Sequence, residues 1–233
     1  HSRSPLRSGA NASCENPLGL NPWNIDALRE IENESGKHIF TILQLRLHPV
    51  LIDLRNRIEQ APAGKKHDID LTYITSRGNW YFISWKGEIQ KSGGIATNIG
   101  IHFFDMLIWI FGSVRENIVH LLQPNKASGY LELEKARVRW FLSLDYKDLP
   151  QAVKAQGKRT YRSITLDDKE IEFSEGFTDL HTKSYEEILA GRGFSMTEAK
   201  TSIETVYTIR NSVAVGLKGE CHEMCRAALK DKH

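Results

Sequence analysis

One stretch near the start of the sequence constrains the fold most. Residues 22–35 (PWNIDALREIENES) have the pattern of an amphipathic helix, with Asn21 as N-cap and Gly36 after the last turn. A run of apolar and β-branched residues follows at 39–45 (IFTILQL) and is long enough for one buried strand. A helix, a glycine and a buried strand form half of a parallel α/β unit, whose strand needs neighbours on both sides. One further strand candidate precedes it, near Ala12. We therefore expect these residues to be the end of a doubly wound α/β domain whose front is missing.

From residue 46 onward the pattern changes to strands in series with helices around them. Expected helices cover residues 49–60, 97–111, 179–190 and 197–217. Expected strands cover residues 67–75, 79–85, 114–122, 130–135, 138–145, 159–166 and 170–173. Asp167 and Asp168 lie between the last two strands and predict a hairpin. This order predicts an α+β fold with an open, mostly antiparallel sheet flanked by helices. We expect it to occupy residues 46–233, with residues 1–45 as a remnant of the preceding α/β domain.

The composition excludes several classes of protein. Of the 233 residues, 40% are hydrophobic and 26% are charged, which is typical of a globular protein with a core. The longest apolar stretch, Ile101–Phe111, is far shorter than the roughly 20 residues of a membrane span. Positive and negative residues are mixed and the net charge is only +2, so we expect no nucleic-acid partner. Three cysteines, an odd and small number, favour the reducing cytoplasm.

The expected helix at 97–111 carries the strongest candidate site. Asn98, His102 and Asp105 are spaced i, i+4 and i+7, which places them on one helix face. Histidine changes its charge near neutral pH and can act as a general base. The stripe therefore indicates a lined site; the alternative is a buried helix in which His102 and Asp105 satisfy each other.

Two further segments are candidates because each follows an expected strand. Residues 14–17 (CENP) end the first strand, and ligands of open α/β sheets bind at the carboxyl ends of strands. An ordinary turn is the alternative for this segment. Arg46 and His48 end the second strand, and Arg46 could pair with a carboxylate or a phosphate. The alternative for Arg46 is an exposed surface side chain.

Other motifs carry less weight. Cys221, His222 and Cys225 offer three metal ligands at an unusual spacing without a second pair, so we expect no metal site. His181 and Tyr185 share a helical face and could reach a pocket, but packing is the simpler interpretation. The sequence contains no Gly-x-Gly-x-x-Gly and no phosphate-binding Gly-Lys-Ser/Thr loop. These residues thus lack the element that holds a dinucleotide pyrophosphate.

Several strings resemble one oxidoreductase family. They are CENPL (14–18), QLRLHP (44–49), SWKGEIQKSGGIATNIGIHFFDML (84–107) and DLHTKSYEEILAGRGF (179–194). They are similar to the glucose-fructose oxidoreductase/inositol dehydrogenase (Gfo/Idh/MocA) family, and within it to the UDP-N-acetyl-2-amino-2-deoxyglucuronate dehydrogenases. The resemblance implies an N-terminal Rossmann domain, of which roughly the first hundred residues are absent. It also implies a C-terminal α+β domain whose sheet builds homo-oligomers.

The resemblance implies a reaction and its partners. The reaction is NAD-dependent oxidation of the C3 hydroxyl of a UDP-N-acetylamino-glucuronate in bacterial surface polysaccharide (lipopolysaccharide) biosynthesis, in the cytoplasm. The family's catalytic histidine falls on His102, with Asn98 one turn before it. Asn16 takes the position of the lysine in the family's Glu-Lys-Pro segment.

The resemblance assigns five more residues to the site. Arg46, Lys86 and Asp105 fall near the substrate, and Glu15 and Pro17 fall beside the cofactor. No metal is implied.

Two departures from the family pattern lower the activity expected of this chain. Asn16 supplies no positive charge, and loss of such a group costs on the order of 10²-fold in rate. The missing dinucleotide fingerprint leaves the hydride acceptor without a holder. We therefore expect little turnover from this chain alone. The alternatives are a non-catalytic sugar-nucleotide binding or assembly subunit, and a dehydrogenase of another sugar or cyclitol.

Overall fold

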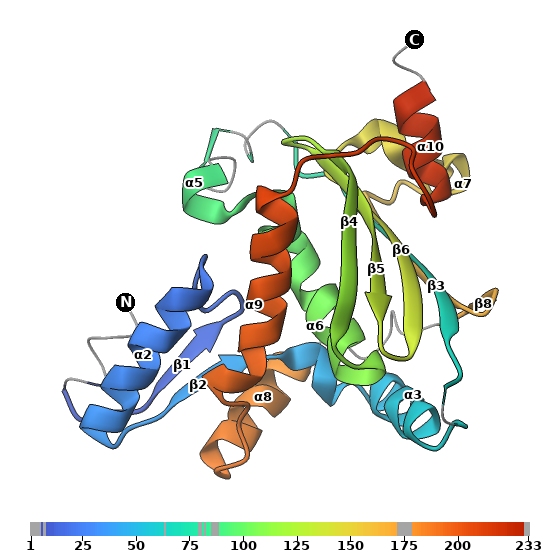
Figure 1. Cartoon of the computed structure of the whole chain (residues 1–233). Coiled ribbons are helices and arrows are strands. Elements are labelled where there is room, and N and C mark those ends of the chain that lie inside the picture. The colour runs from blue at the N-terminus through green and yellow to red at the C-terminus, as the bar shows by residue number, and fades with distance from the viewer. Residues whose placement is uncertain are drawn as a thin grey trace.

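The computed structural model describes residues 6, 8–62, 64–78, 81, 83, 84, 89–171 and 179–230. Two sheets organise this part of the chain (Figure 1). The smaller sheet pairs β1 (Ala12–Glu15) with β2 (Ile39–Ile42) in parallel. The larger sheet has six strands in the order β4-β5-β6-β3-β7-β8. The fold is therefore a mixed α/β arrangement dominated by one open sheet.

The helix expected at the start is confirmed with its bounds. α2 (Pro22–Ser35) begins after Asn21, whose backbone N–H donates to Oδ1 of Asn24 in a capping box. It ends at Gly36, whose φ of 62° lies in the left-handed region that favours glycine. The strand expected at 39–45 is shorter, because β1 is four residues long and pairing stops at Ile42. The chain then turns into a short 3₁₀ helix, η1 (Gln44–Leu47).

The six-stranded sheet confirms the open, mostly antiparallel prediction. Its strands are β3 (His67–Thr75), β4 (Val114–Leu122), β5 (Lys126–Leu133), β6 (Ala136–Ser143), β7 (Thr160–Leu166) and β8 (Lys169–Glu170). Only the pair β3–β6 is parallel, and all other pairs are antiparallel. The hairpin at Asp167–Asp168 is confirmed, with φ of 49° and 63°, the values of a tight hairpin turn.

Helices cover both faces of this sheet (Figure 1). α3 (Pro49–Glu59), α6 (Ile101–Phe111) and α9 (Met196–Asn211) pack on one face, which also carries Leu71 and Trp140. α8 (Leu180–Leu189) and η1 lie beside them. α7 (Gln151–Ala155) and α10 (Glu223–Lys230) lie on the opposite face with a smaller apolar cluster. The remaining short elements are α5 (Ile89–Ser92), η2 (Ala96–Gly100) and η3 (Tyr146–Asp148).

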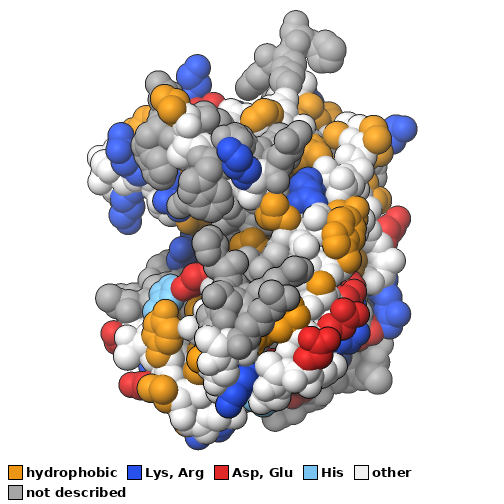
Figure 2. Space-filling model, turned by 90° about the vertical axis from the view of Figure 1, so that its left-hand side faces the viewer, with side chains coloured by type: hydrophobic (Ala, Val, Ile, Leu, Met, Phe, Trp, Pro, Cys, Tyr) orange, Lys and Arg blue, Asp and Glu red, His pale blue; other side chains and the backbone are white. Residues whose placement is uncertain are grey.

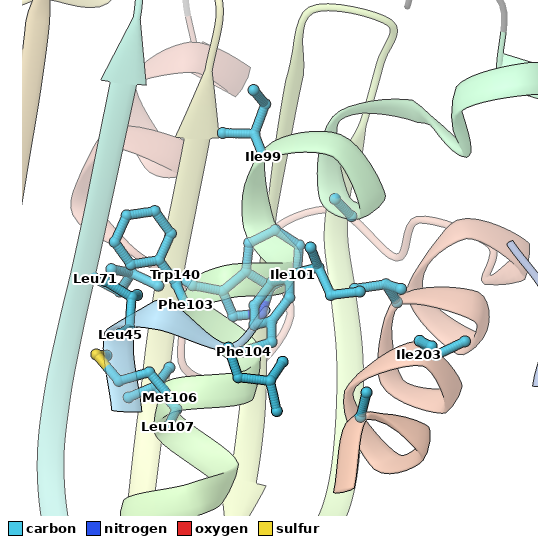
Figure 3. Packing of buried hydrophobic residues seen from close by; sticks show 14 of the residues in the cluster. Leu45, Leu71, Ile99, Ile101, Phe103, Phe104, Met106, Leu107, Trp140 and Ile203 are labelled. Carbon is cyan, nitrogen blue, oxygen red and sulfur yellow. The ribbon is translucent and has the colours of Figure 1, made fainter. Parts of the chain in front are cut away.

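The core lies between α6 and the sheet. Phe104 of α6 meets Trp140 of β6 edge to face, with ring centroids 5.2 Å apart (Figure 3). Gly100 permits the helix to approach the sheet closely, because a Cβ at this position would come within 2.7 Å of both Leu142 and Phe104. The start of α6 is therefore pressed tightly against the sheet.

Other expectations need correction. The strands expected at 130–135 and 138–145 begin earlier, at Lys126 and Ala136. The helix expected at 197–217 ends at Asn211, because the following segment runs beside the edge strand β4, where the Val215 N–H donates to the Val119 carbonyl at 2.9 Å. Sequence periodicity missed α10 altogether.

The strand expected at 79–85 lies mostly outside the described residues; Tyr81 and Ile83 within it are helical. Among the described helices, none combines the length and apolarity needed to cross a membrane.

Candidate functional site

The helix with the predicted polar stripe begins irregularly. Residues Ala96–Gly100 form a π-helical turn (η2) that runs directly into α6 at Ile101. Such turns widen the helix and change the direction of its side chains, and they are frequent at functional sites. Asn98 lies in the π-helical turn, whereas His102 and Asp105 lie in the regular helix. The three residues therefore share one helix but meet different partners.

His102 is held in its neutral form. Burial is the main cause that lowers its pKa from 6.5 to about 4, and the nearby His181 of α8 lowers it further. At neutral pH the imidazole is therefore uncharged and can accept a proton. Nδ1 of His181 lies 3.5 Å from Oε1 of Glu15 at the end of β1. His102, His181 and Glu15 thus bring α6, α8 and β1 to one place.

Asn98 has a partner that sequence reasoning missed. Its Nδ2 donates to the hydroxyl of Tyr81 at 3.2 Å. Burial raises the pKa of Tyr81, so the hydroxyl keeps its proton at neutral pH. Tyr81 fell within an expected strand, and no local pattern linked it to a residue 17 positions away.

Asn16 is the most distinctive buried polar residue of the site. Its side chain is 4% exposed, and neither Oδ1 nor Nδ2 has a hydrogen-bond partner among the described residues. It directly follows β1, at the carboxyl end of a parallel strand, and a cis peptide bond joins it to Pro17. Because buried amides are normally hydrogen-bonded, this one is suited to a polar ligand group.

Arg46 and Asp105 lie against each other. Nε and Nη2 of Arg46 donate to the two carboxylate oxygens of Asp105 at 2.9 and 2.8 Å. Both side chains are almost fully buried, with exposures of 7% and 3%. The alternative of a surface arginine is therefore wrong, and so is the alternative of a pair between His102 and Asp105. Contact of Arg46 and Asp105 with a substrate stays a prediction.

The remaining predicted residues are placed as follows. Lys86 lies outside the described residues. Glu15 is exposed beside His181, and Pro17 follows the buried Asn16. Cys221, His222 and Cys225 belong to the opposite face of the sheet, where Nε2 of His222 meets the Thr72 hydroxyl at 3.0 Å. Within the described ranges, His, Cys, Asp and Glu side chains form no cluster suited to a metal ion.

The face of the molecule seen in Figure 2 is hollowed. Figure 2, which views the left-hand side of Figure 1, shows a histidine and an acidic side chain together at the edge of the hollow. Lys and Arg side chains gather above them. Because a histidine, an acidic side chain and basic side chains lie around it, this hollow is suited to a polar small molecule.

Comparison with known proteins agrees with the fold. Residues 58–149 match the family model described as "Oxidoreductase family, C-terminal alpha/beta domain" of the Gfo/Idh/MocA proteins. The myo-inositol 2-dehydrogenase of Thermotoga maritima is 31% identical over 105 residues, which are 45% of this chain and 30% of that enzyme. The chain thus matches less than a third of that enzyme's length.

Solved structures give longer matches. The WlbA (WbpB) dehydrogenase from Thermus thermophilus, in complex with NAD and α-ketoglutarate, is 50% identical, with a TM-score of 0.89. The match covers 94% of this chain and 71% of that one. The same dehydrogenase in complex with NAD and UDP-GlcNAcA matches at 49% identity over 95% of this chain and 71% of that one, with a TM-score of 0.89. The chain belongs to the Gfo/Idh/MocA oxidoreductase family.

Proposed function

We propose that this chain forms the substrate-binding side of an NAD-dependent dehydrogenase that oxidises the C3 hydroxyl of a UDP-N-acetylamino-glucuronate. The observation that carries the proposal is the meeting of His102, His181 and Glu15 at one place, with the buried Asn16 directly after Glu15 in the chain. The 50% identity to a dehydrogenase solved with NAD, and with UDP-GlcNAcA in a second complex, supports the choice of cofactor and substrate.

His102 would accept the proton of the substrate hydroxyl. The uncharged imidazole has the protonation state that a general base needs at neutral pH. A pKa of about 4 makes it a weak base in the free protein. The carboxylate and diphosphate of the substrate are negative, and they would raise the pKa of His102 when they bind nearby. Substrate binding would thereby strengthen the base.

Asn98 and Asn16 would orient the reacting hydroxyl. An amide both donates and accepts hydrogen bonds, which suits a sugar hydroxyl. The bond from Asn98 to Tyr81 fixes one of these amides. The buried amide of Asn16 has no partner among the described residues and so has both groups available. Lys86 would contact the substrate by resemblance. The same resemblance assigns Arg46 and Asp105 to the substrate, but their bonds to each other leave them little capacity for a ligand.

The residues at the end of β1 fit a bound NAD. The unpartnered amide of Asn16 lies at the carboxyl end of a parallel strand, between Glu15 and Pro17. When bound, NAD supplies the acceptor for the hydride that leaves C3. Glu15 and Pro17 would lie beside it, and His102 would hold the hydroxyl proton.

The finer assignments follow from the same resemblance. The product would serve bacterial surface polysaccharide (lipopolysaccharide) biosynthesis, and the protein would work in the cytoplasm as a homo-oligomer built through the six-stranded sheet.

Two alternatives each have an observation in their favour. Asn16, which lacks the charge of the family lysine, favours a binding or assembly subunit. The match to myo-inositol 2-dehydrogenase favours a cyclitol as substrate.

Formation of NADH by the purified chain, which we expect to be slow because these residues lack a dinucleotide fingerprint, tests the proposal. UDP-GlcNAcA and myo-inositol would be offered separately to the wild-type chain, His102→Ala and Asn16→Lys. We expect UDP-GlcNAcA to be the better substrate, His102→Ala to lose on the order of 10²-fold or more in rate, and Asn16→Lys to gain rate. Faster oxidation of myo-inositol would favour the cyclitol alternative. Because the wild-type rate is expected to be low, the binding subunit would be favoured by UDP-GlcNAcA binding together with no gain of rate in Asn16→Lys.

A further inference from the structure

The guanidinium group of Arg46 makes hydrogen bonds within the protein on nearly every side. Besides the two bonds to Asp105, its Nη2 donates to the backbone carbonyl of Glu198 at 3.1 Å and its Nη1 to Oε1 of Glu198 at 3.4 Å. The ring of Phe194 lies 5.4 Å from the guanidinium carbon. Four of the five N–H groups of a guanidinium are thus engaged within the protein. Little capacity remains for a ligand.

These contacts join three elements that are distant in the sequence. Arg46 lies in η1, Asp105 in α6, and Glu198 in the first turn of α9. Asp105 is 59 positions and Glu198 is 152 positions away from Arg46. The strand that precedes η1 is attached to the same region, because the Thr41 N–H donates to the Phe194 carbonyl at 2.8 Å.

The position of Asp105 links the bonded group Arg46–Asp105–Glu198 to His102. Asp105 follows His102 by three residues, so the two lie on the same side of α6, one turn apart. The turn before His102 is π-helical and lacks regular α-helical bonding. Among the described residues, the bidentate bond at Asp105 is therefore the nearest polar side-chain anchor on the regular part of the helix. Together with the packing of Phe104 on Trp140, it sets the rotation of α6 about its axis.

We propose that Arg46 is a positioning residue that acts through Asp105 and Glu198 to hold His102 in the site, rather than a ligand of the substrate. This inference rests on the proposed role of His102. The Arg46–Asp105 pair is buried, short and bidentate, which are the properties of a structural anchor. A substrate-binding arginine would instead present free N–H groups to the hollow.

Two measurements that need no enzymatic activity test the inference. One is the NMR titration of the His102 ring, and the other is amide hydrogen exchange over residues 98–105. The main variant is Arg46→Met/Asp105→Leu, because replacing both charges by apolar groups leaves no unpaired buried charge and preserves the fold. Arg46→Met alone is measured beside it.

Arg139→Met is the matched control. Nε and Nη2 of Arg139 donate to both oxygens of Asp70 at 2.7 and 2.8 Å, so it also loses a bidentate pair. Arg139 precedes Trp140 on β6 and therefore faces the side of the sheet opposite to α6.

We expect amide exchange over residues 98–105 to become at least tenfold faster in the double variant, and the His102 titration midpoint to move from about 4 toward 6.5. Arg139→Met should leave both quantities within twofold of the wild type. An unchanged midpoint and unchanged exchange in a folded double variant would overturn the inference. If that variant also lost affinity for UDP-GlcNAcA, Arg46 would be a substrate ligand. Failure of the proposed function would show separately, as a wild-type chain that neither binds nor oxidises UDP-GlcNAcA.

Discussion

The stability of this protein should fall as the pH drops from 7 to 5, and two histidines should account for much of the loss. Burial lowers the pKa of both His102 and His222 from 6.5 to about 4. Between pH 6.5 and 4 the unfolded chain therefore binds more protons than the folded one. The free energy of unfolding rises with pH wherever the unfolded state binds more protons, so it decreases upon acidification.

The magnitude follows from the two pKa values. A shift from 6.5 to about 4 gives about 3 kcal/mol when acidification is complete, and about 2 kcal/mol between pH 7 and pH 5. His222 is 4% exposed and should show this full effect. His102 is only half-buried and should show the smaller part. Because native domains are stable by about 5–15 kcal/mol, the loss is readily measured.

Urea unfolding at pH 7 and pH 5 provides the assay. His222→Gln keeps an amide that can bond the Thr72 hydroxyl but cannot titrate. We expect the free energy of unfolding of this variant to fall about 2 kcal/mol less than that of the wild type between the two pH values. His102→Gln should reduce the pH dependence in the same direction. Equal pH dependence in the wild type and both variants would refute the reasoning.

Three further predictions concern the stability of the sheet, a helix cap and a hairpin. Gly129→Ala should cost about 1–3 kcal/mol, because the added Cβ would run into the Ile118 carbonyl and come within 2.7 Å of the Trp140 ring; a wild-type urea midpoint would contradict this. Ser195→Ala should cost about 1 kcal/mol by removing the capping box of α9, and unchanged thermal unfolding would count against that cap. Asp168→Gly should add about 0.5 kcal/mol, because φ is 63° there, and a lower melting temperature would oppose it.

Features with strong local signals were predictable from the sequence. The helix at 22–35 has a cap, an apolar stripe and a terminal glycine within one short segment, and its bounds are confirmed. The hairpin at Asp167–Asp168 likewise needs only its own residues. The shortening of β2 was not predictable, because it depends on the four-residue length of its partner β1.

The helix that carries the candidate residues was predictable, but the partners of those residues were not. Helical spacing correctly grouped Asn98, His102 and Asp105 on one helix. The spacing could not reveal the π-helical turn that contains Asn98, nor the partner of Asp105, which is 59 positions away. Arg46 had the sequence signature of an ordinary surface arginine, and only the packing of η1 against α6 and α9 buries it.

Binding of UDP-GlcNAcA, measured by isothermal titration calorimetry, tests the central claim most directly. The wild-type chain would be compared with Asn98→Ala, which removes an amide of the site, and with Arg139→Met, which alters the opposite face of the sheet. We predict saturable binding at one site, weakened at least tenfold by Asn98→Ala and unchanged by Arg139→Met. Absence of binding by a folded wild-type chain, or equal affinity in the wild type and Asn98→Ala, would contradict the account.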